Sequence, residues 1–209
     1  MIVLEKFSSL STEKQNMIID AALACFGANG YKKASIGDIA AAAGIAKASV
    51  FHYFGTKKSL YFYLLDFCMQ ALMNEINEKF DSSVTDFFDR IKLSTSIELS
   101  IMKQHPPMLS FLDSMYFEND SEVKDDIKTI LTSDRCVEMR SRITFDGMDA
   151  SKFKDGIDPK LVLKILSCFV DGYLVKAQNN AEVDLDVLCK EVDECLNLFK
   201  RNFYKEKYI

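Results

Sequence analysis

Residues 35–60 of this 209-residue chain read SIGDIAAAAGIAKASVFHYFGTKKSL, and they predict two short helices joined by a tight turn. Ser35 can accept a hydrogen bond at the start of the first helix, and Asp38 lies in its first turn, where the helix dipole favours negative charge. Gly44 supplies a left-handed residue that ends this helix, and a second helix follows over residues 47–53. Two helices joined by so short a glycine turn are typical of the DNA-binding helix-turn-helix, whose second helix enters the major groove.

The residues after the motif also favour an anionic partner. Thr56 is a good N-cap for a third helix, yet Lys57 and Lys58 follow it. Cations in a first turn oppose the helix dipole and cost about 0.3–1 kcal/mol each when exposed. Because backbone N–H groups at a helix start already attract phosphate, we interpret the two lysines as contacts to the DNA backbone. The alternative for either lysine alone is an ordinary solvated side chain.

A longer ordered pattern runs through the same region. It comprises Ala-Cys-Phe-Gly-Ala-Asn-Gly-Tyr (24–31), Ala-Ser-Ile-Gly-Asp-Ile-Ala (34–40), Ala-Gly-Ile-Ala-Lys-Ala-Ser-Val-Phe-His-Tyr-Phe (43–54) and Thr-Lys-Lys-Ser-Leu (56–60). With these runs, residues 12–66 resemble the DNA-binding domain of the tetracycline-repressor-like (TetR) family of bacterial transcription regulators. The rest of the chain resembles the family only in length and helical character.

The resemblance implies an all-α fold with two domains. A three-helix, helix-turn-helix DNA-binding domain would occupy residues 1–55, and a helical domain for effector binding and dimerisation would occupy residues 56–209. Residues 1–60 carry seven Lys and four acidic residues, a net charge of +3, so the remainder carries −8 of the total of −5. A basic amino-terminal unit on an acidic body is typical of a protein that presents one face to nucleic acid.

Composition argues against other classes of protein. The six cysteines form no CxxC pair and the chain has only two histidines, so we expect no metal and no cofactor. No segment is long and apolar enough for a signal peptide or a membrane span, which predicts a reduced, cytoplasmic protein. No arrangement typical of nucleophilic or metal-dependent catalysis is present, so we expect no enzyme. A thiol switch through Cys189 and Cys195 stays open, although their spacing puts them on different sides of a helix.

The remaining segments read mostly as helices. Residues 1–11 are expected to be a mobile lead, and the first helix begins at a capping box of Thr12 and Gln15 and ends at Gly30. Residues 146–157 have no apolar period and predict a loop. The other expected helices cover about 56–80, 84–104, 108–118, 122–145, 159–178 and 184–204.

The last two helices, about 159–178 and 184–204, carry broad apolar stripes. These stripes are wider than one packing partner needs, so we expect the pair to form the interface of a homodimer, as the resemblance also implies. Gly172 costs about 1 kcal/mol relative to alanine within a helix, and a close helix crossing would offset this cost. The alternative is that both helices only close the core of one subunit.

The resemblance places the DNA contacts on the second helix of the motif and beside it. Lys47 would reach a phosphate or a guanine edge, and the small Ala48 would let the helix approach the bases. Ser35 is more simply a helix cap, and Phe51 stands where the family usually has tyrosine, so packing is its first expected role. The predicted DNA-contacting residues are Ser35, Lys47, Ala48, Ser49, Phe51, His52, Tyr53 and Lys57.

The resemblance also implies a small-molecule pocket in the carboxy-terminal domain. Methionine and phenylalanine at helical spacing are more often core than cavity, so a small apolar effector stays a hypothesis without a named ligand. The residues predicted to line the pocket are Met69, Met73, Met102, Phe111, Met115, Tyr116, Phe169 and Tyr173.

Together these observations predict a sequence-specific transcriptional regulator. As a repressor, its dimer would bind a palindromic operator in double-stranded DNA through half-sites ~34–36 Å apart. An effector would favour a spacing of the two recognition helices that no longer fits the operator. The alternative is a ligand-independent DNA-binding protein of the same fold that recruits a protein partner, which a filled core in the carboxy-terminal domain would support.

Overall fold

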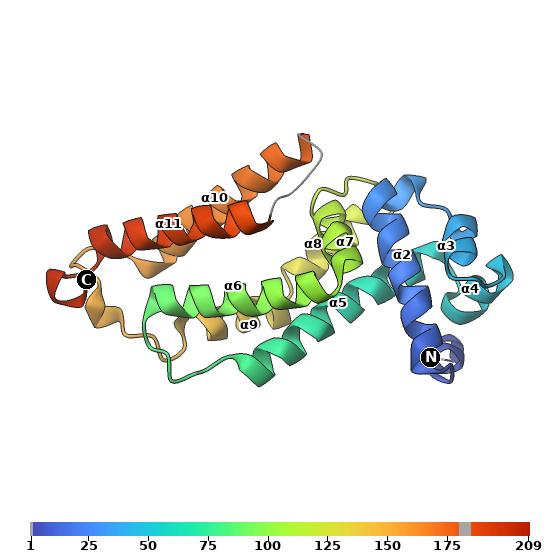
Figure 1. Ribbon diagram of the computed structural model, residues 1–209, viewed down its shortest axis with the longest axis horizontal. Helices are drawn as coiled ribbons and strands as arrows, with labels where there is room; N and C mark the ends of the chain where they lie inside the picture. The colour runs from blue at the N-terminus through green and yellow to red at the C-terminus, as the bar shows by residue number, and fades with distance from the viewer. Residues whose placement is uncertain (1, 180–184) are drawn as a thin grey trace. The chain divides into compact units, whose positions relative to one another are not determined.

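The computed structural model describes residues 2–179 and 185–209. Within these ranges the chain is built from helices, with one isolated antiparallel bridge between Phe153 and Tyr204 and no β-strand, which confirms the expected all-α class (Figure 1). In chain order the elements are α1 (Ile2–Ser8), α2 (Thr12–Lys33), α3 (Ile36–Ala42), α4 (Lys47–Phe54), α5 (Lys57–Lys79), α6 (Phe87–Gln104), α7 (Pro106–Tyr116), α8 (Lys124–Leu131), α9 (Asp134–Phe145), η1 (Ala150–Lys152, 3-10), α10 (Pro159–Asn179), α11 (Leu185–Phe203) and η2 (Glu206–Tyr208, 3-10).

The chain divides into two compact units. The first comprises Met1–Phe80 and Ser96–Glu138, and the second comprises Asp81–Thr95 and Met139–Ile209, so α6 and α9 contribute to both. The boundary between residues 55 and 56 that we expected from the sequence falls inside the first unit. It stays a prediction about where the DNA-binding and effector functions separate. No helix in the described ranges is long and apolar enough to cross a membrane.

The first unit is built around α2. Ile18, Ala22 and Phe26 recur at helical spacing along its buried face, and α3, α5 and α7 pack on it. The Phe26 ring meets those of Tyr61 on α5 and Phe111 on α7, with centroids 5.1 Å and 6.4 Å apart. This aromatic cluster holds the three helices together, while α4 packs on α3 and α5.

A glycine permits the close contact between α2 and α7. A Cβ atom on Gly27 would lie 2.5 Å from Oγ of Ser110, 2.8 Å from its carbonyl carbon and 2.9 Å from the backbone nitrogen of Phe111. Two of these neighbours are backbone atoms, which a side-chain rotation cannot move. Any side chain at position 27 would therefore force α7 away from α2.

The amino-terminal residues differ from the expectation of a mobile lead. Residues 2–8 form α1, and Phe7 is 1% exposed within the core of the first unit. The lead was predicted from residues 1–11 alone, whereas the apolar partners of Phe7 lie much later in the chain. The expectation was wrong because short helices are stabilised by tertiary packing, which local sequence does not reveal.

The start of α2 also departs from the expected capping box. Ser11, rather than Thr12, is the N-cap residue. The amide Nε2 of Gln15 donates hydrogen bonds backward to the carbonyl oxygens of Ser8, at 3.3 Å, and Leu10, at 2.9 Å. Gln15 therefore ties the end of α1 to α2 instead of completing a capping box.

The single helix expected over 122–145 is two helices, α8 and α9, separated at Thr132 and Ser133. The hydroxyl of Thr132 donates to the carbonyl of Lys128 at 2.8 Å, and that of Ser133 donates to the carbonyl of Ile130 at 2.7 Å. Side-chain hydroxyls that bond nearby carbonyls compete with the helical ladder, which accounts for the break. The other helices begin and end within a few residues of the expected positions.

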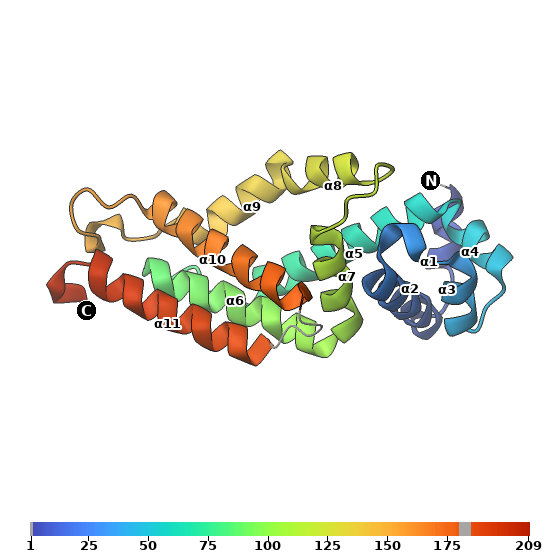
Figure 2. The same ribbon diagram turned by 90° about the horizontal axis from the view of Figure 1, so that it is seen from above.

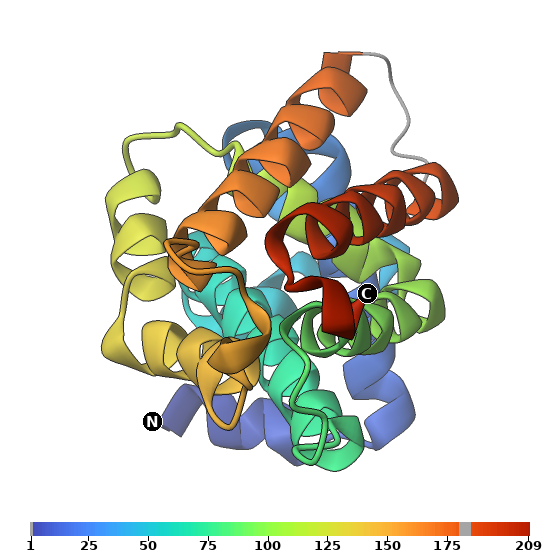
Figure 3. The same cartoon turned by 90° about the vertical axis from the view of Figure 1, so that its left-hand side faces the viewer.

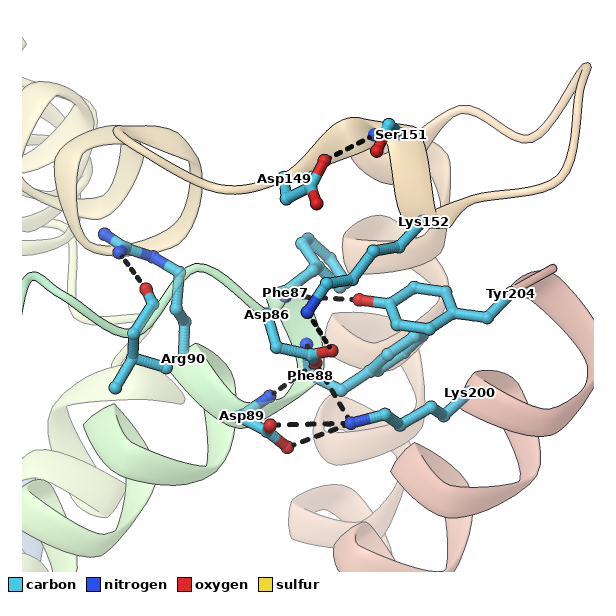
Figure 4. A network of polar contacts seen from close by, with 11 residues as sticks. Asp86, Phe87, Phe88, Asp89, Arg90, Asp149, Ser151, Lys152, Lys200 and Tyr204 are labelled. Atoms are coloured by element: carbon cyan, nitrogen blue, oxygen red, sulfur yellow. Dashed lines mark hydrogen bonds and ion pairs between the residues drawn. The ribbon is translucent and has the colours of Figure 1, made fainter. Parts of the chain in front are cut away.

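The second unit has its own aromatic core, and in it α10 and α11 lie side by side (Figure 2). The ring of Phe153 lies 5.4 Å from that of Phe87 and 4.9 Å from that of Tyr204. The carboxy-terminal end thereby returns to the start of α6 (Figure 3). There the Tyr204 hydroxyl accepts a hydrogen bond from the Phe87 backbone at 3.2 Å (Figure 4).

Charged groups complete this second core. The Asp86 carboxylate forms ion pairs with Nζ of Lys152 at 3.0 Å and with Nζ of Lys200 at 3.2 Å. Figure 4 shows this carboxylate between the two amino groups. Asp86 also accepts the backbone N–H groups of Phe88 and Asp89, so it caps the start of α6. One buried carboxylate therefore joins three segments that are distant in sequence.

Candidate nucleic-acid interface

The helix-turn-helix is formed as its local sequence predicts. Ser35 has extended backbone angles, and its hydroxyl accepts the N–H groups of Gly37 at 3.1 Å and Asp38 at 3.4 Å. Gly44 has a φ of +62°, in the left-handed region, and directs the chain from α3 into α4. The capping role of Ser35 is thus observed, and a phosphate contact by the same hydroxyl stays a prediction.

The predicted DNA-contacting residues of α4 share one outward arc. Val50 and Phe54 point into the core and are buried. Of the other six residues of α4, four are exposed and two are half-buried, which leaves much of this short helix open to a partner. The exposed residues are Lys47, Ala48, Phe51 and His52, and the half-buried ones are Ser49 and Tyr53.

Phe51 differs from the role first expected for it. Its side chain is 43% exposed, so packing in the core does not account for its position. It lies instead among the outward residues of α4. A contact of Phe51 with DNA, the role that the sequence suggested second, stays a prediction.

Lys57 and Lys58 have partners within the protein. Nζ of Lys57 donates to the carbonyl oxygen of Lys32 at 3.2 Å and lies 4.8 Å from the centroid of the Tyr31 ring. Nζ of Lys58 forms an ion pair with Asp126 at 2.7 Å. These contacts explain why two cations are tolerated in the first turn of α5, so the argument that they require an external anion loses its force. The DNA contact of Lys57 stays a prediction.

An acidic turn after α7 holds the connection between α2 and α3. Oε2 of Glu118 accepts the backbone N–H of Tyr31 at 2.7 Å, and Oε1 accepts the N–H groups of Asn119 and Asp120. Tyr31 follows Gly30, where a φ of +67° breaks the helical ladder, so its N–H needs an acceptor outside α2. Sequence analysis missed Glu118, because the two bonded residues lie 87 positions apart.

The phenol of Tyr31 completes this junction. Burial, with a hydrogen bond to Glu122, raises the pKa of Tyr31 above its ordinary value. The phenol hydroxyl of Tyr31 therefore stays protonated at any pH near 7. The junction consequently joins the end of α2, the start of α5 and the turn after α7 within the first unit.

Two aromatic contacts connect the exposed side of α4 to the core of the first unit. The imidazole of His52 meets the ring of Tyr53 edge-on, with centroids 5.7 Å apart. Tyr53 in turn lies 6.0 Å from the ring of Phe7 on α1. Phe7 was not among the candidate residues, and Glu5 and Lys6 directly before it hide its buried position from a local reading of the sequence.

The residues predicted to line an effector pocket are divided between the two units. Phe111 and Met115 are buried where α7 packs on α2, and Met69 and Met73 on α5 are half-buried. Tyr116 is exposed. Phe169 is half-buried and packs against the core of the second unit. The side chains of Met102 and Tyr173 lie outside the described residues, and the pocket stays a prediction.

Two of the described cysteines have a raised thiol pKa. Burial raises the pKa of Cys68 to about 12, which keeps it protonated and unreactive. Burial, together with Glu191 and Glu194, also raises the pKa of Cys195 above its ordinary value. Cys168 is exposed, and Cys25, Cys189 and Cys195 are half-buried. Among the described residues, no cluster of His, Cys, Asp and Glu could hold a metal ion.

Known proteins share both the motif and the fold. Residues 18–64 match the family described as bacterial regulatory proteins, tetR family. The fatty acid metabolism regulator protein of Bacillus subtilis is 23% identical over 184 residues, which cover 88% of this chain and 93% of that protein.

Two solved structures show the same architecture along nearly the whole chain. A TetR family transcriptional regulator from Chloroflexus aurantiacus has a TM-score of 0.70 and 19% identity, covering 97% of this chain and 98% of that one. The transcriptional regulator FadR of Bacillus subtilis, in complex with stearoyl-CoA, has a TM-score of 0.66 and 21% identity, covering 87% and 96%. At these identities the likeness establishes the fold.

Proposed function

Because residues 18–64 make this chain a member of the TetR family of bacterial regulatory proteins, we propose that it is a dimeric repressor that an apolar effector releases from DNA. The observation that carries the proposal is the outward arc of α4. Lys47, Phe51 and His52 are exposed together on a helix that a glycine turn presents to solvent. Such a helix fits the major groove, where lysine can read guanine and an aromatic edge can meet a thymine methyl group.

Each residue of the arc has a role in this proposal. Lys47 contacts a phosphate or guanine from the first turn of α4, and Ala48 allows close approach. Ser49, His52 and Tyr53 donate hydrogen bonds to phosphate or bases. The flanking Ser35 and Lys57 lie at helix starts, where backbone N–H groups favour phosphate. Two such arcs, one per subunit, would read half-sites ~34–36 Å apart on a palindrome.

The dimer is proposed to form through α10 and α11. Leu161 and Ile165 on α10 are 55% and 44% exposed, and Leu198 on α11 is 57% exposed. Cys168 and Gly172 are also exposed, and with Leu161 and Ile165 they follow the 0, 4, 7, 11 spacing of a helix-packing seam. A second copy would cover these apolar side chains.

A long-chain acyl-CoA thioester is the effector class that we propose. The support is the likeness to FadR of Bacillus subtilis, whose structure contains stearoyl-CoA, and to a protein named as a regulator of fatty acid metabolism. The acyl chain matches the apolar effector that the sequence suggested. A regulator of this kind acts on DNA in the cytoplasm and performs no catalysis.

The packing of α7 favours one alternative. Phe111 and Met115 fill the contact between α7 and α2, so two of the predicted pocket residues are already used in the core. This arrangement is compatible with a ligand-independent DNA-binding protein that recruits another protein. The two readings differ in whether any small molecule changes operator binding.

Selection of bound duplexes from a random DNA pool, at one stated salt concentration, tests the proposal. The full-length protein is compared with a Lys47→Ala/Tyr53→Ala double variant. We expect the unaltered protein alone to enrich one palindrome, because the double variant loses two side chains of the arc. If neither protein enriches any sequence, sequence-specific regulation is wrong.

The enriched duplex then serves to test the effector. Stearoyl-CoA is titrated into the complex beside stearate and free coenzyme A as matched controls. We expect release by the thioester and by neither control. A complex that none of the three releases, together with retained operator specificity, would favour the ligand-independent alternative.

A further inference from the structure

Helix α1 lies outside the residues that match the TetR family and nevertheless packs on the recognition helix α4. Figure 2 shows α1 beside α4 within the first unit. Its anchor is Phe7, whose side chain is buried, and Gln15 holds the end of α1 by donating to the carbonyl of Ser8. α1 is therefore a fixed part of this unit.

Phe7 fills the angle between α4 and α5. Its ring centroid lies 4.8 Å from that of Phe54, 5.4 Å from that of Tyr63 and 6.0 Å from that of Tyr53. Phe54 and Tyr53 are the last two residues of α4, and Tyr63 belongs to α5. Three aromatic rings from two helices thus converge on one side chain of α1.

Packing on neighbouring helices, α1 among them, is what holds the orientation of α4. It has eight residues, and its N-cap residue Ala46 makes no side-chain hydrogen bond. Helices this short are not stable alone, so packing of their buried side chains must hold them. The buried side chains of α4 are Val50 and Phe54, and Phe54 is the nearest ring to Phe7.

We propose that Phe7 is a positioning residue for DNA recognition. It fixes the carboxy-terminal half of α4 through Phe54 and sets the ring of Tyr53, against which His52 packs edge-on. Phe7 does not touch DNA in this arrangement. The inference rests on the proposed role of α4, and it adds α1 to the helices that support the motif.

The test compares three full-length variants: Phe7→Ala, Phe7→Leu and the matched control Phe153→Ala. Phe153 is equally enclosed by aromatic rings but belongs to the second unit, so its truncation should lower the melting temperature without altering α4. Two quantities are measured, the affinity for the selected operator and the hydrogen exchange of the amides of residues 47–54.

We expect Phe7→Ala to raise amide exchange in residues 47–54 and to lower operator affinity. Because displacing a base-reading side chain costs about as much as one mismatched base pair, the affinity should fall about tenfold. Phe7→Leu, which refills most of the space, should restore both quantities. Phe153→Ala should change neither, even where its melting temperature falls as far.

The two readouts separate this inference from the repressor proposal. Equal exchange of residues 47–54 in Phe7→Ala and Phe153→Ala would overturn the inference, because Phe7 would then be ordinary core. Unchanged operator affinity in Phe7→Ala would overturn it too. Raised exchange in Phe7→Ala alone, with no duplex selected by the unaltered protein, would support the positioning of α4 and contradict the DNA-binding function.

Discussion

At the scale of single residues, two lysines at helix starts occupy different surroundings. Lys47 is exposed in the first turn of α4, whereas Lys58 in the first turn of α5 pairs with Asp126. Both residues carry the same charge, and both were interpreted from the sequence as contacts to DNA. The ion pair makes Lys58 a matched control for Lys47.

We predict that Lys47→Ala weakens operator binding by about 1–3 kcal/mol, because a phosphate or base contact is lost. The slope of the logarithm of the binding constant against the logarithm of the salt concentration should become shallower by about one. Lys58→Ala should change operator binding less, since its amino group already has a partner, and an exposed pair contributes only about 0–1 kcal/mol to stability. Binding isotherms at several salt concentrations measure both effects. Equal losses would mean that α5 contributes as much to DNA binding as α4.

At the scale of elements, the contact of α7 with α2 holds the segment that leads into the helix-turn-helix. Gly27 allows the close approach, and Glu118 closes the far end of the contact by accepting the Tyr31 N–H. Ser114 adds a hydrogen bond from its hydroxyl to the carbonyl of Phe26 at 3.3 Å. The segment that leads into α3 is therefore held by a helix that follows it by about eighty residues.

Gly27→Ala is predicted to lower the free energy of unfolding by about 1–3 kcal/mol, because the added methyl group overpacks this contact. A second Ser110→Gly substitution should not restore stability, since backbone atoms at 2.8 Å and 2.9 Å would still obstruct the methyl group. Denaturant unfolding of the single and double variants measures this. Full rescue by Ser110→Gly would show that the hydroxyl alone is the obstacle.

At the scale of the whole molecule, each compact unit has a separate core, and charge contributes to the second one. Burial alone would raise the pKa of Asp86, but the hydrogen bond from Lys152, the N–H of Asp89 and the charge of Lys200 hold it below its ordinary value. A lowered pKa in the folded state means that Asp86 stabilises the fold above its unfolded pKa of about 3.9. This stabilisation is lost as the pH falls through the folded pKa.

We therefore expect Asp86→Asn to lower stability at pH 7 by about 1–3 kcal/mol and to flatten the loss of stability below about pH 4. Asp89→Asn is the matched control, because Asp89 also meets Lys200, at 3.2 Å, but is 54% exposed. Asp89→Asn should change the free energy of unfolding by no more than about 1 kcal/mol. Unfolding curves from pH 7 to pH 2 compare the variants, and an equally steep acid dependence in Asp86→Asn would contradict the assignment.

The sequence alone determined the features that depend on neighbours within a few positions. The cap at Ser35, the left-handed turn at Gly44 and the helical class follow from bonds that close over two to five residues, which local sequence encodes. The contrast between buried Val50 and exposed His52 follows from helical spacing in the same way.

Only the tertiary structure decided the contacts between distant residues. Phe7 is buried because its aromatic partners lie on α4 and α5, and Lys58 is paired because Asp126 comes from α8. Glu118 meets Tyr31 across 87 positions. The physical reason is that such pairs depend on how helices pack, and a periodic pattern shows which face of a helix is buried without showing which helix covers it.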